Sequence, residues 1–219
     1  KIVNSAIILA GGRGSRISSD IPKQFLQVYN KRIIDFSIQA FEINKNIDEI
    51  ILVINKNWIN QFKHEYKNYI LVEGGKYRSD SSLNGILACD EQASNVLIHD
   101  AARPLLSQEI INKSIDHLLT YQATTPFVNI SDSIIQKENN QVKYLDRDTI
   151  KIIQTPQGFN KQILETALKK TNIRNTDDIS TLLSYNPDAK VNFFEGDKNN
   201  FKITNDLDLT IFESMINED

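Results

Sequence analysis

The chain alternates between short, continuous apolar runs and longer amphipathic segments. The apolar runs are rich in β-branched residues and are predicted to be strands: residues 5–10, 49–54, 69–73, 95–100 and 190–196. The amphipathic segments are predicted to be helices: residues 35–43, 82–91, 109–119, 161–170 and a last helix from about residue 206. Continuous apolar strands separated by helices are typical of a parallel sheet that is buried on both faces. The predicted fold class is therefore α/β.

Residues 124–153 show a different pattern. Apolar and polar residues alternate there as in two strands around a polar turn at Glu138, Asn139 and Asn140, which predicts a hairpin arm. A hairpin is marginally stable alone in water, so the arm is expected to need a partner surface. We expect a single domain over residues 1–219 from which this arm projects.

Composition excludes several classes of function. The 219 residues, 40% of them hydrophobic, are enough for a full core. The net charge of -3 provides no global basic field for nucleic acid or an anionic membrane, so any anion site must be local. No apolar run approaches the roughly 18 residues of a membrane helix. Cys89 is the only cysteine, which excludes a disulfide framework and suits the cytoplasm.

The loop after the first predicted strand is rich in glycine and is followed by positive charge, before a predicted helix. It contains Gly11, Gly12, Gly14, Arg16 and Lys23. Glycines let backbone N–H groups approach an anion closely, as in loops that bind phosphate. Ile17 stands where a dinucleotide fingerprint needs glycine, and no Walker A string occurs. A tight turn with solvated cations explains this loop equally well when it is taken alone.

The stretch EGGKYRSDSS follows another predicted strand. Ser79, Asp80 or Ser81 could cap the next helix. Capping does not require the paired glycines Gly74 and Gly75, which suggest a backbone that lies against a flat group such as a base.

The stretch HDAARP ends a third apolar strand, at the edge where α/β sheets bind ligands. Asp100 is a candidate ligand of magnesium or substrate, and Arg103 is a candidate anion clamp. The alternative interpretation makes Asp100 a helix cap, Arg103 its ion-pair partner, and His99 a core histidine with satisfied hydrogen bonds. His64 and His117 lack metal-ligand spacing, so a zinc site is not expected.

Five cations each lie near a predicted strand end or loop: Arg16, Lys23, Arg103, Arg147 and Lys202. A mildly acidic protein that gathers such cations at one rim is suited to a polyphosphate substrate.

The motifs together resemble a known family. LAGGRGSR, PKQF, EGGKYRSDS, HDAARP, DRDTIKIIQTPQGF, NTDD, NFKIT and DLDL occur in the order and spacing of the 2-C-methyl-D-erythritol 4-phosphate cytidylyltransferases, over nearly the whole chain. The resemblance implies a Rossmann-like, GT-A-type nucleotidyltransferase fold with a mostly parallel sheet and a projecting β-arm. It also implies a homodimer made by arm exchange, and transfer of CMP from CTP to methylerythritol phosphate with Mg2+.

The resemblance further implies a role for each matched position. The catalytic residues are Arg16, Lys23 and Lys202. The CTP-binding residues are Ala10, Gly11, Gly12, Gly14, Gly75, Lys76 and Ser81. The acceptor-binding residues are Asp100, Arg103, Ser133 and Arg147, with Asp100 also the metal ligand.

The ribitol-5-phosphate cytidylyltransferases share most of these motifs and are the alternative. AGG in the first loop, where AAG is usual, favours the ribitol branch, whereas HDAARP and DRDTIKIIQTPQGF favour the methylerythritol branch. Ser133 keeps the hydroxyl of the threonine that is usual there. The methylerythritol branch is preferred, and a catalytically silent homologue is less consistent with the retained cations.

Overall fold

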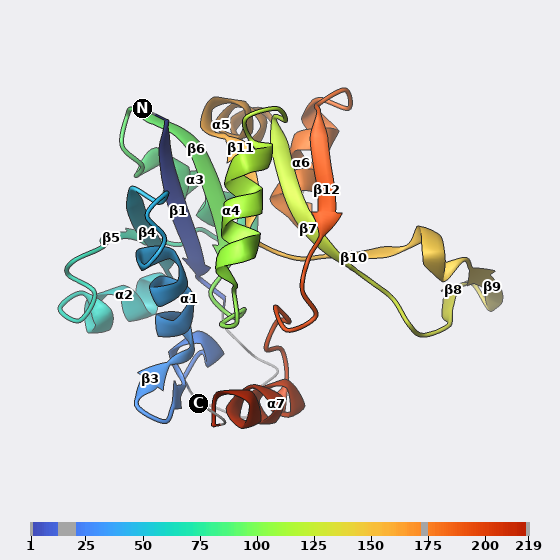
Figure 1. Ribbon diagram of the computed structural model, residues 1–219, viewed down its shortest axis with the longest axis horizontal. Coiled ribbons are helices and arrows are strands. Elements are labelled where there is room, and N and C mark those ends of the chain that lie inside the picture. The colour runs from blue at the N-terminus through green and yellow to red at the C-terminus, as the bar shows by residue number, and fades with distance from the viewer. Residues whose placement is uncertain (1, 13–20, 172–174, 218–219) are drawn as a thin grey trace.

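The computed structural model describes residues 2–12, 21–171 and 175–217. A mixed, mostly parallel eight-stranded sheet lies between two layers of helices, and a two-stranded hairpin projects from one side (Figure 1). The predicted α/β class is confirmed. No helix in the described ranges is long and apolar enough to cross a bilayer.

The main sheet has the strand order β10-β7-β11-β6-β1-β4-β5, and β12 pairs with β7. The strands are β1 (Val3–Ala10), β4 (Glu49–Ile54), β5 (Ile70–Glu73), β6 (Ala93–Asp100), β7 (Ala123–Asn129), β10 (Lys151–Ile153), β11 (Gln157–Asn160) and β12 (Val191–Glu195). β1 pairs in parallel with β4 on one side and with β6 on the other. The chain therefore changes direction across the sheet between β1 and β6, which is where open α/β sheets form a ligand crevice.

Within the described ranges, seven α-helices surround the sheet (Figure 1). They are α1 (Ile33–Glu42), α2 (Lys56–Phe62), α3 (Arg78–Leu87), α4 (Gln108–His117), α5 (Lys161–Lys170), α6 (Asp178–Tyr185) and α7 (Asp206–Ile216). Alternate residues of β1 face opposite layers. Ile8 packs with Ile34 of α1 and Ile110 of α4, whereas Ile7 packs with the layer that contains α3, α5 and α6. Each such buried side chain contributes about 2 kcal/mol of hydrophobic stabilisation.

Every predicted strand and helix is present, but some boundaries differ. α3 begins at Arg78 rather than near residue 82, because the Asp80 side chain accepts a hydrogen bond from the Tyr77 backbone N–H at 3.0 Å and starts the helix early. The first loop leads into a short 3₁₀ helix, η1 (Lys23–Phe25), and into the small hairpin β2 (Gln27–Val28) and β3 (Lys31–Arg32) before α1. α2, α6 and β11 were not predicted.

A ladder of asparagines crosses three strands near the edge of the sheet opposite the crevice. Asn4 of β1 is in register with Asn95 of β6, which is in register with Asn160 of β11. The Asn160 amide donates to Asn95 Oδ1 at 3.1 Å, and the Asn95 amide donates to Asn4 Oδ1 at 2.9 Å. Because a shift of one residue would break both bonds, of which that between Asn95 and Asn4 is buried, the ladder specifies the register of these strands.

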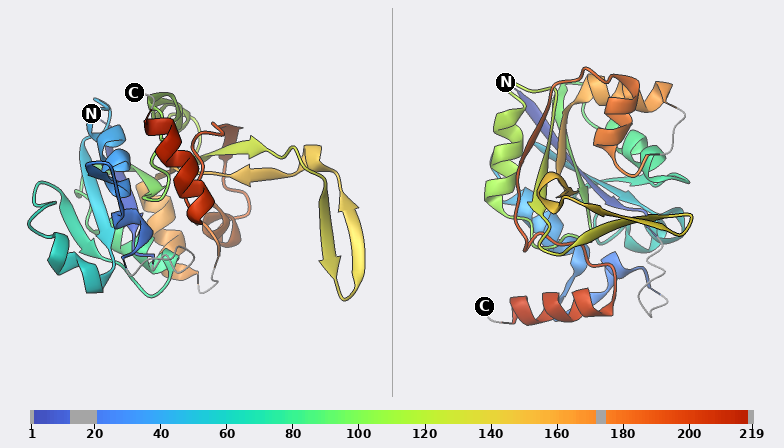
Figure 2. Two further views of the ribbon diagram at one scale, coloured as in Figure 1. Left: turned by 90° about the horizontal axis from the view of Figure 1, so that it is seen from below. Right: turned by 90° about the vertical axis from the view of Figure 1, so that its right-hand side faces the viewer.

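The arm is a separate two-stranded sheet formed by β8 (Ile134–Glu138) and β9 (Gln141–Leu145). Its turn lies at Asn139 and Asn140, whose φ angles of 45° and 66° are the left-handed values that a tight hairpin turn requires. The hairpin and its turn confirm the sequence pattern. β7 and β10 pair within the main sheet, so the projecting part spans residues 130–150 (Figure 2).

Candidate functional site

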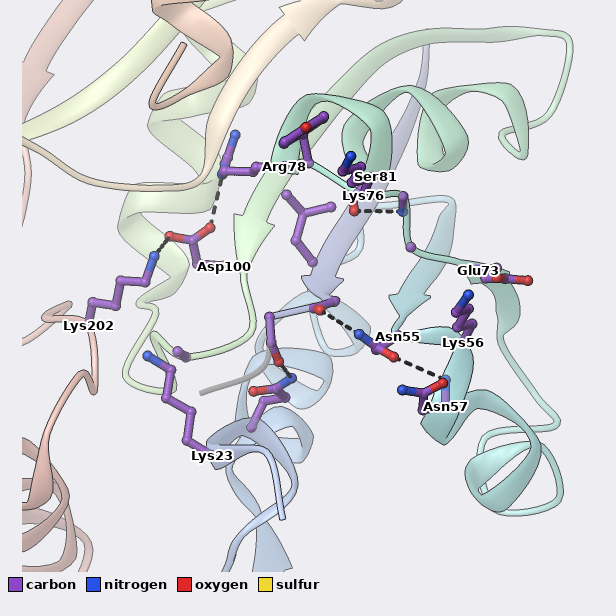
Figure 3. Close-up of a pocket in the computed structure, with 18 of the residues that line it drawn as sticks. Lys23, Asn55, Lys56, Asn57, Glu73, Lys76, Arg78, Ser81, Asp100 and Lys202 are labelled. Carbon is purple, nitrogen blue, oxygen red and sulfur yellow. Dashed lines mark hydrogen bonds and ion pairs between the residues drawn. The ribbon is translucent and has the colours of Figure 1, made fainter. Parts of the chain in front are cut away.

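A cavity of about 1010 Å³ opens at the carboxyl ends of β1, β4, β5 and β6 (Figure 3). Eight of the residues selected from the sequence line it: Gly11, Gly12, Lys23, Gly75, Lys76, Ser81, Asp100 and Lys202. Its size is at the upper end of ordinary small-molecule sites and is sufficient for a nucleotide. The parallel strands thus bring distant motifs to one place.

One wall is the loop Ala10–Gly12, which continues β1. Gln24 donates both of its Nε2 hydrogen bonds to this loop, to the carbonyls of Ala10 and Gly12, each at 2.8 Å. The Asn55 amide donates to the carbonyl between them, that of Gly11, at 3.2 Å. Ala10 is buried behind the wall. Two further predicted residues of this loop, Gly14 and Arg16, lie outside the described residues.

A second wall is the loop between β5 and α3, which lies directly against the first at Gly11 and Gly74. The Ser81 hydroxyl accepts a hydrogen bond from the Gly75 backbone N–H at 3.1 Å, so it helps to shape the loop. A Cβ atom at Gly75 would lie 2.1 Å from the Cβ of Asp80. The first turn of α3 therefore requires glycine at position 75 whether or not a flat ligand lies against it.

Asp100, at the end of β6, is surrounded by three cations. Its carboxylate lies 2.8 Å from Lys202 Nζ, 3.5 Å from Arg78 Nη2 and 3.9 Å from Arg103 Nε. Burial alone would raise the pKa of Asp100, but the three positive charges outweigh it and hold the pKa well below the usual carboxyl value. Asp100 therefore stays ionised, and the positive charges of its partners are only partly compensated.

A directed chain of hydrogen bonds fixes the backbone at Asp100. The Asp100 N–H donates to the Thr155 hydroxyl at 3.1 Å, that hydroxyl lies 3.0 Å from His99 Nδ1, and His99 Nε2 lies 3.0 Å from the Arg103 carbonyl. A carbonyl can only accept, so the proton sits on Nε2, and Nδ1 accepts from Thr155. Burial lowers the pKa of His99 to about 4. The interpretation of His99 as a satisfied core histidine is confirmed.

The two arginines around Asp100 differ in their exposure to the cavity. Arg103 is buried, donates from Nη1 to the Asn200 carbonyl at 2.8 Å and does not line the cavity. Arg78 lines the cavity and pairs with Asp178 at 2.5 Å as well as with Asp100. Sequence reasoning did not select Arg78, although it lies within the quoted motif EGGKYRSDS. Its position in the first turn of the helix after the paired glycines was the available signal.

Two predicted acceptor residues lie on the arm. Ser133 is exposed, and the Arg147 guanidinium donates to the Ser131 carbonyl at 2.5 Å. The arm extends away from the side of the sheet where its own chain forms the cavity (Figures 1 and 2). The structure of one chain therefore does not bring these residues to the other predicted site residues.

The side chains of the cavity suit a metal ion that is bound jointly by the protein and by phosphate groups of a substrate. The described ranges contain no group of three or more His, Cys, Asp or Glu side chains that could hold a metal. Asp100 is a single carboxylate. Mg2+ commonly binds through one or two carboxylates together with substrate phosphates, so Asp100 fits that mode and not a protein-only cage.

The described lining residues include neither histidine nor cysteine. Lys23, Lys76, Arg78 and Lys202 instead supply fixed positive charge beside two glycine-containing loops. Such equipment stabilises the charge that develops on phosphate oxygens, and it needs no covalent intermediate. The Rossmann-like sheet and this cationic crevice define the class of nucleotide-dependent group transferases.

Comparison with known proteins identifies the family. The model of the 2-C-methyl-D-erythritol 4-phosphate cytidylyltransferase family (IspD) matches residues 4–218. Proteins with that name from Clostridium botulinum (strain 657) and Clostridium perfringens (strain SM101) are 37% and 38% identical to this chain. The alignments cover 97% and 96% of this chain and 97% of each relative. The chain belongs to this family.

Solved structures agree. The 4-diphosphocytidyl-2C-methyl-D-erythritol synthase of Anaerococcus prevotii superposes with a TM-score of 0.86 at 30% identity, covering 99% of this chain and 96% of that one. The bifunctional IspDF of Campylobacter jejuni gives a TM-score of 0.83 at 29% identity. This chain corresponds to 53% of that longer protein. The ribitol alternative gains no better support.

Proposed function

We propose that this protein transfers CMP from CTP to 2-C-methyl-D-erythritol 4-phosphate and forms CDP-methylerythritol and pyrophosphate. The observation that carries the proposal is the convergence of Lys23, Lys202 and Arg78 on one cavity, between two loops that contain glycine. Membership of the family supports the choice of acceptor.

In the proposed reaction, Gly11, Gly12, Gly75 and Ser81 hold the nucleotide through backbone and hydroxyl groups. An oxygen of the acceptor phosphate forms a bond to the α-phosphorus of CTP, and the bond from that phosphorus to the oxygen of the leaving pyrophosphate breaks. Lys23 and Lys202 stabilise the negative charge that grows on the α-phosphate. A phosphate monoester is largely ionised at neutral pH, so the attack needs no general base.

Mg2+ is proposed as the cofactor. Asp100 would hold it together with phosphate oxygens of CTP, and the ion would neutralise part of the triphosphate charge. Lys202 and Arg78 orient the Asp100 carboxylate from two sides, which leaves its position well defined.

We also propose a homodimer in which each arm reaches the partner's cavity, so that Ser133 and Arg147 bind the acceptor phosphate of the neighbouring site. The arm exposes Ile135, Val142 and Tyr144, a set of apolar side chains that would gain from a covering surface. Its extension away from its own cavity supports exchange.

Mixed dimers test the exchange. Arg147→Ala and Lys23→Ala subunits are each expected to be nearly inactive alone. In an equal mixture about half of the dimers are mixed, and each mixed dimer has one intact site, so activity should recover to about a quarter of the wild-type value. Verified mixed dimers that stay inactive would contradict shared sites.

The proposed location is the cytoplasm. Cys89 is buried and free, as expected in a reducing compartment. The proposed partners, CTP and a polyol phosphate, are water-soluble small molecules.

A pyrophosphate-release assay tests the proposed reaction. CTP is supplied with methylerythritol phosphate, ribitol 5-phosphate or glycerol 3-phosphate, and release is expected with the first. Lys113→Ala is a matched control, because Lys113 is a surface lysine that pairs with Glu109 on α4. Release with ribitol 5-phosphate alone would assign the protein to the alternative branch, and no release with any acceptor would contradict the enzyme proposal.

A further inference from the structure

Two carboxamide side chains hold three consecutive carbonyls in the first wall of the cavity. Gln24 donates to the carbonyls of Ala10 and Gly12. Asn55, which is labelled in Figure 3, donates to that of Gly11. Gln24 is 3% exposed, and its bond to the Ala10 carbonyl is buried, whereas its bond to the Gly12 carbonyl is partly buried. The two side chains come from different elements, η1 and the end of β4.

These hydrogen bonds hold in one conformation a loop whose glycines favour many. Glycine loses more conformational freedom on ordering than any other residue, so a loop containing Gly11 and Gly12 is costly to hold in one shape. In a trans peptide, the C=O of one residue and the N–H of the next point in opposite directions. Holding the carbonyls of Ala10 and Gly11 therefore also sets the directions of the N–H groups of Gly11 and Gly12.

Gln24 also connects this loop to a cation. It lies next to Lys23 in the same turn of η1. The backbone of Lys23 is thus tied to the loop through the Gln24 side chain, across the interval that contains residues 13–20. Any movement of η1 away from the loop would break two hydrogen bonds of 2.8 Å.

We propose that Gln24 is a positioning residue, which pre-organises the loop Ala10–Gly12 for the nucleotide and sets the place of Lys23 relative to it. Asn55 has the same role for the middle carbonyl of the loop, that of Gly11. The inference rests on the proposed function for its catalytic consequence, but the hydrogen bonds themselves can be tested without turnover.

The key variant is Gln24→Glu, which keeps the size and shape of the side chain. A carboxylate accepts hydrogen bonds and cannot donate them, so it would face two carbonyl oxygens without a proton. The turnover number is expected to fall on the order of 10²-fold, because a misplaced charge-stabilising group loses most of its effect. Gln24→Met, uncharged and of similar length, serves as a second variant if Gln24→Glu does not fold.

The matched control is Gln108→Glu. Gln108 also donates its amide to a backbone carbonyl, that of Ala40 at 2.7 Å, but it lies on α4 and does not line the cavity. Its turnover number should stay within about twofold of wild type. An equal loss in both variants would mean a general folding defect and would overturn the proposal.

A double-mutant cycle shows whether Gln24 acts through Lys23. In a Lys23→Ala background, Gln24→Glu should cost less than about threefold in turnover, because the group to be positioned is gone. If Gln24→Glu lowered the turnover number as much in the Lys23→Ala background as in wild type, Gln24 would act independently of Lys23, and that part of the proposal would be overturned.

Asn55→Asp separates two roles of Asn55. Aspartate can still accept the hydrogen bond from the Asn57 backbone N–H that caps α2, but it cannot donate to the Gly11 carbonyl. The Km for CTP should rise several-fold without loss of thermal stability. An unchanged Km would show that Asn55 does not help to position the loop Ala10–Gly12 for CTP.

Hydrogen exchange of side-chain amides tests the geometry directly. Both Nε2 protons of Gln24 should exchange far more slowly than those of the exposed Gln61, and this holds whether or not any acceptor is turned over. Rapid exchange would overturn the proposed hydrogen bonds. Slow exchange in a protein that releases no pyrophosphate would instead contradict the proposed function alone.

Discussion

The rim of the cavity and the arm are built in opposite ways. At the rim, the Asp100 carboxylate has three cationic neighbours and the loop Ala10–Gly12 has its carbonyls held by side-chain amides. On the arm, β8 and β9 pair with each other, and Tyr144 is 76% exposed, with Ile135 and Val142 about half exposed. In the proposed enzyme, the nucleotide half of the site would be pre-organised within one chain, whereas the arm would gain its second surface from the proposed partner subunit.

The largest expected effect concerns the rim. Lys23→Ala should reduce the turnover number by a factor on the order of 10² to 10³, because a charge-stabilising donor is worth roughly 3–4 kcal/mol of barrier. Steady-state pyrophosphate release measures the loss, with Lys113→Ala as the control. Near-normal turnover would remove Lys23 from the reacting centre.

A fall in pH should lower the free energy of unfolding through protonation of His99, which lies beside Asp100 at the rim. The unfolded chain binds a proton on this histidine near its ordinary pKa of 6.5, whereas the folded protein does so only near its lowered pKa of about 4. Stability is therefore lost as the pH falls from 6.5 to 4, by about 3 kcal/mol. Asp100 and Arg103, whose charges act on His99, stay ionised over this range.

Chemical unfolding at a series of pH values checks this expectation. The free energy of unfolding of His99→Gln, which has no titrating ring, should fall less steeply than that of wild type between pH 6.5 and 4. Parallel slopes for the two proteins would show that His99 is not the group responsible.

A pair of glycine variants compares the two walls of the rim. Gly75→Ala would place a Cβ atom 2.1 Å from that of Asp80, so overpacking should lower stability by about 1–3 kcal/mol. Gly12→Ala meets no atom within 4 Å and should leave stability unchanged, while raising the Km for CTP if the nucleotide occupies that space. Thermal unfolding and CTP kinetics separate the two effects, and equal losses of stability would contradict the described packing.

The smallest effect on folding is expected on the arm. Tyr144→Ser should change the stability of the subunit by less than about 0.5 kcal/mol, because the side chain packs against little within its own chain. It should weaken self-association, measured by sedimentation at several concentrations. A large loss of subunit stability would mean that the arm folds back on its own chain.

The sequence was sufficient for most of the fold because its signals were periodic. The strands of the parallel sheet were predicted from uninterrupted apolar runs such as 49–54 and 95–100, and the arm from alternation around a polar turn. α6 was missed although its start carries a local signal: Asp177 caps it by accepting a hydrogen bond from the Ser180 backbone N–H at 2.8 Å. Only the second support of this helix start is invisible in the local sequence: the side chain of Gln157 accepts hydrogen bonds from the backbone N–H groups of Asp178 and Ile179.

Eight of the residues that line the cavity could be selected from sequence motifs, but their mutual contacts could not. Lys23, Asp100 and Lys202 were selected because cations and a carboxylate followed strand ends, and the fold brings them to one cavity. The role of Arg78 between Asp100 and Asp178 depends on partners 22 and 100 residues away, so only the folded chain reveals it. The sequence also could not show that Gly75 is required by its neighbour Asp80.

The asparagine ladder has a consequence for how tolerance to mutation is distributed over the molecule. Asn4 and Ala10 lie near opposite ends of β1, roughly 20 Å apart at the usual rise per residue. An error of register at Asn4 would move every residue of the strand to the wrong face, including those that carry the loop Ala10–Gly12. A map of mutational sensitivity should therefore contain two separate regions, of which the second, at Asn4, Asn95 and Asn160, touches no ligand.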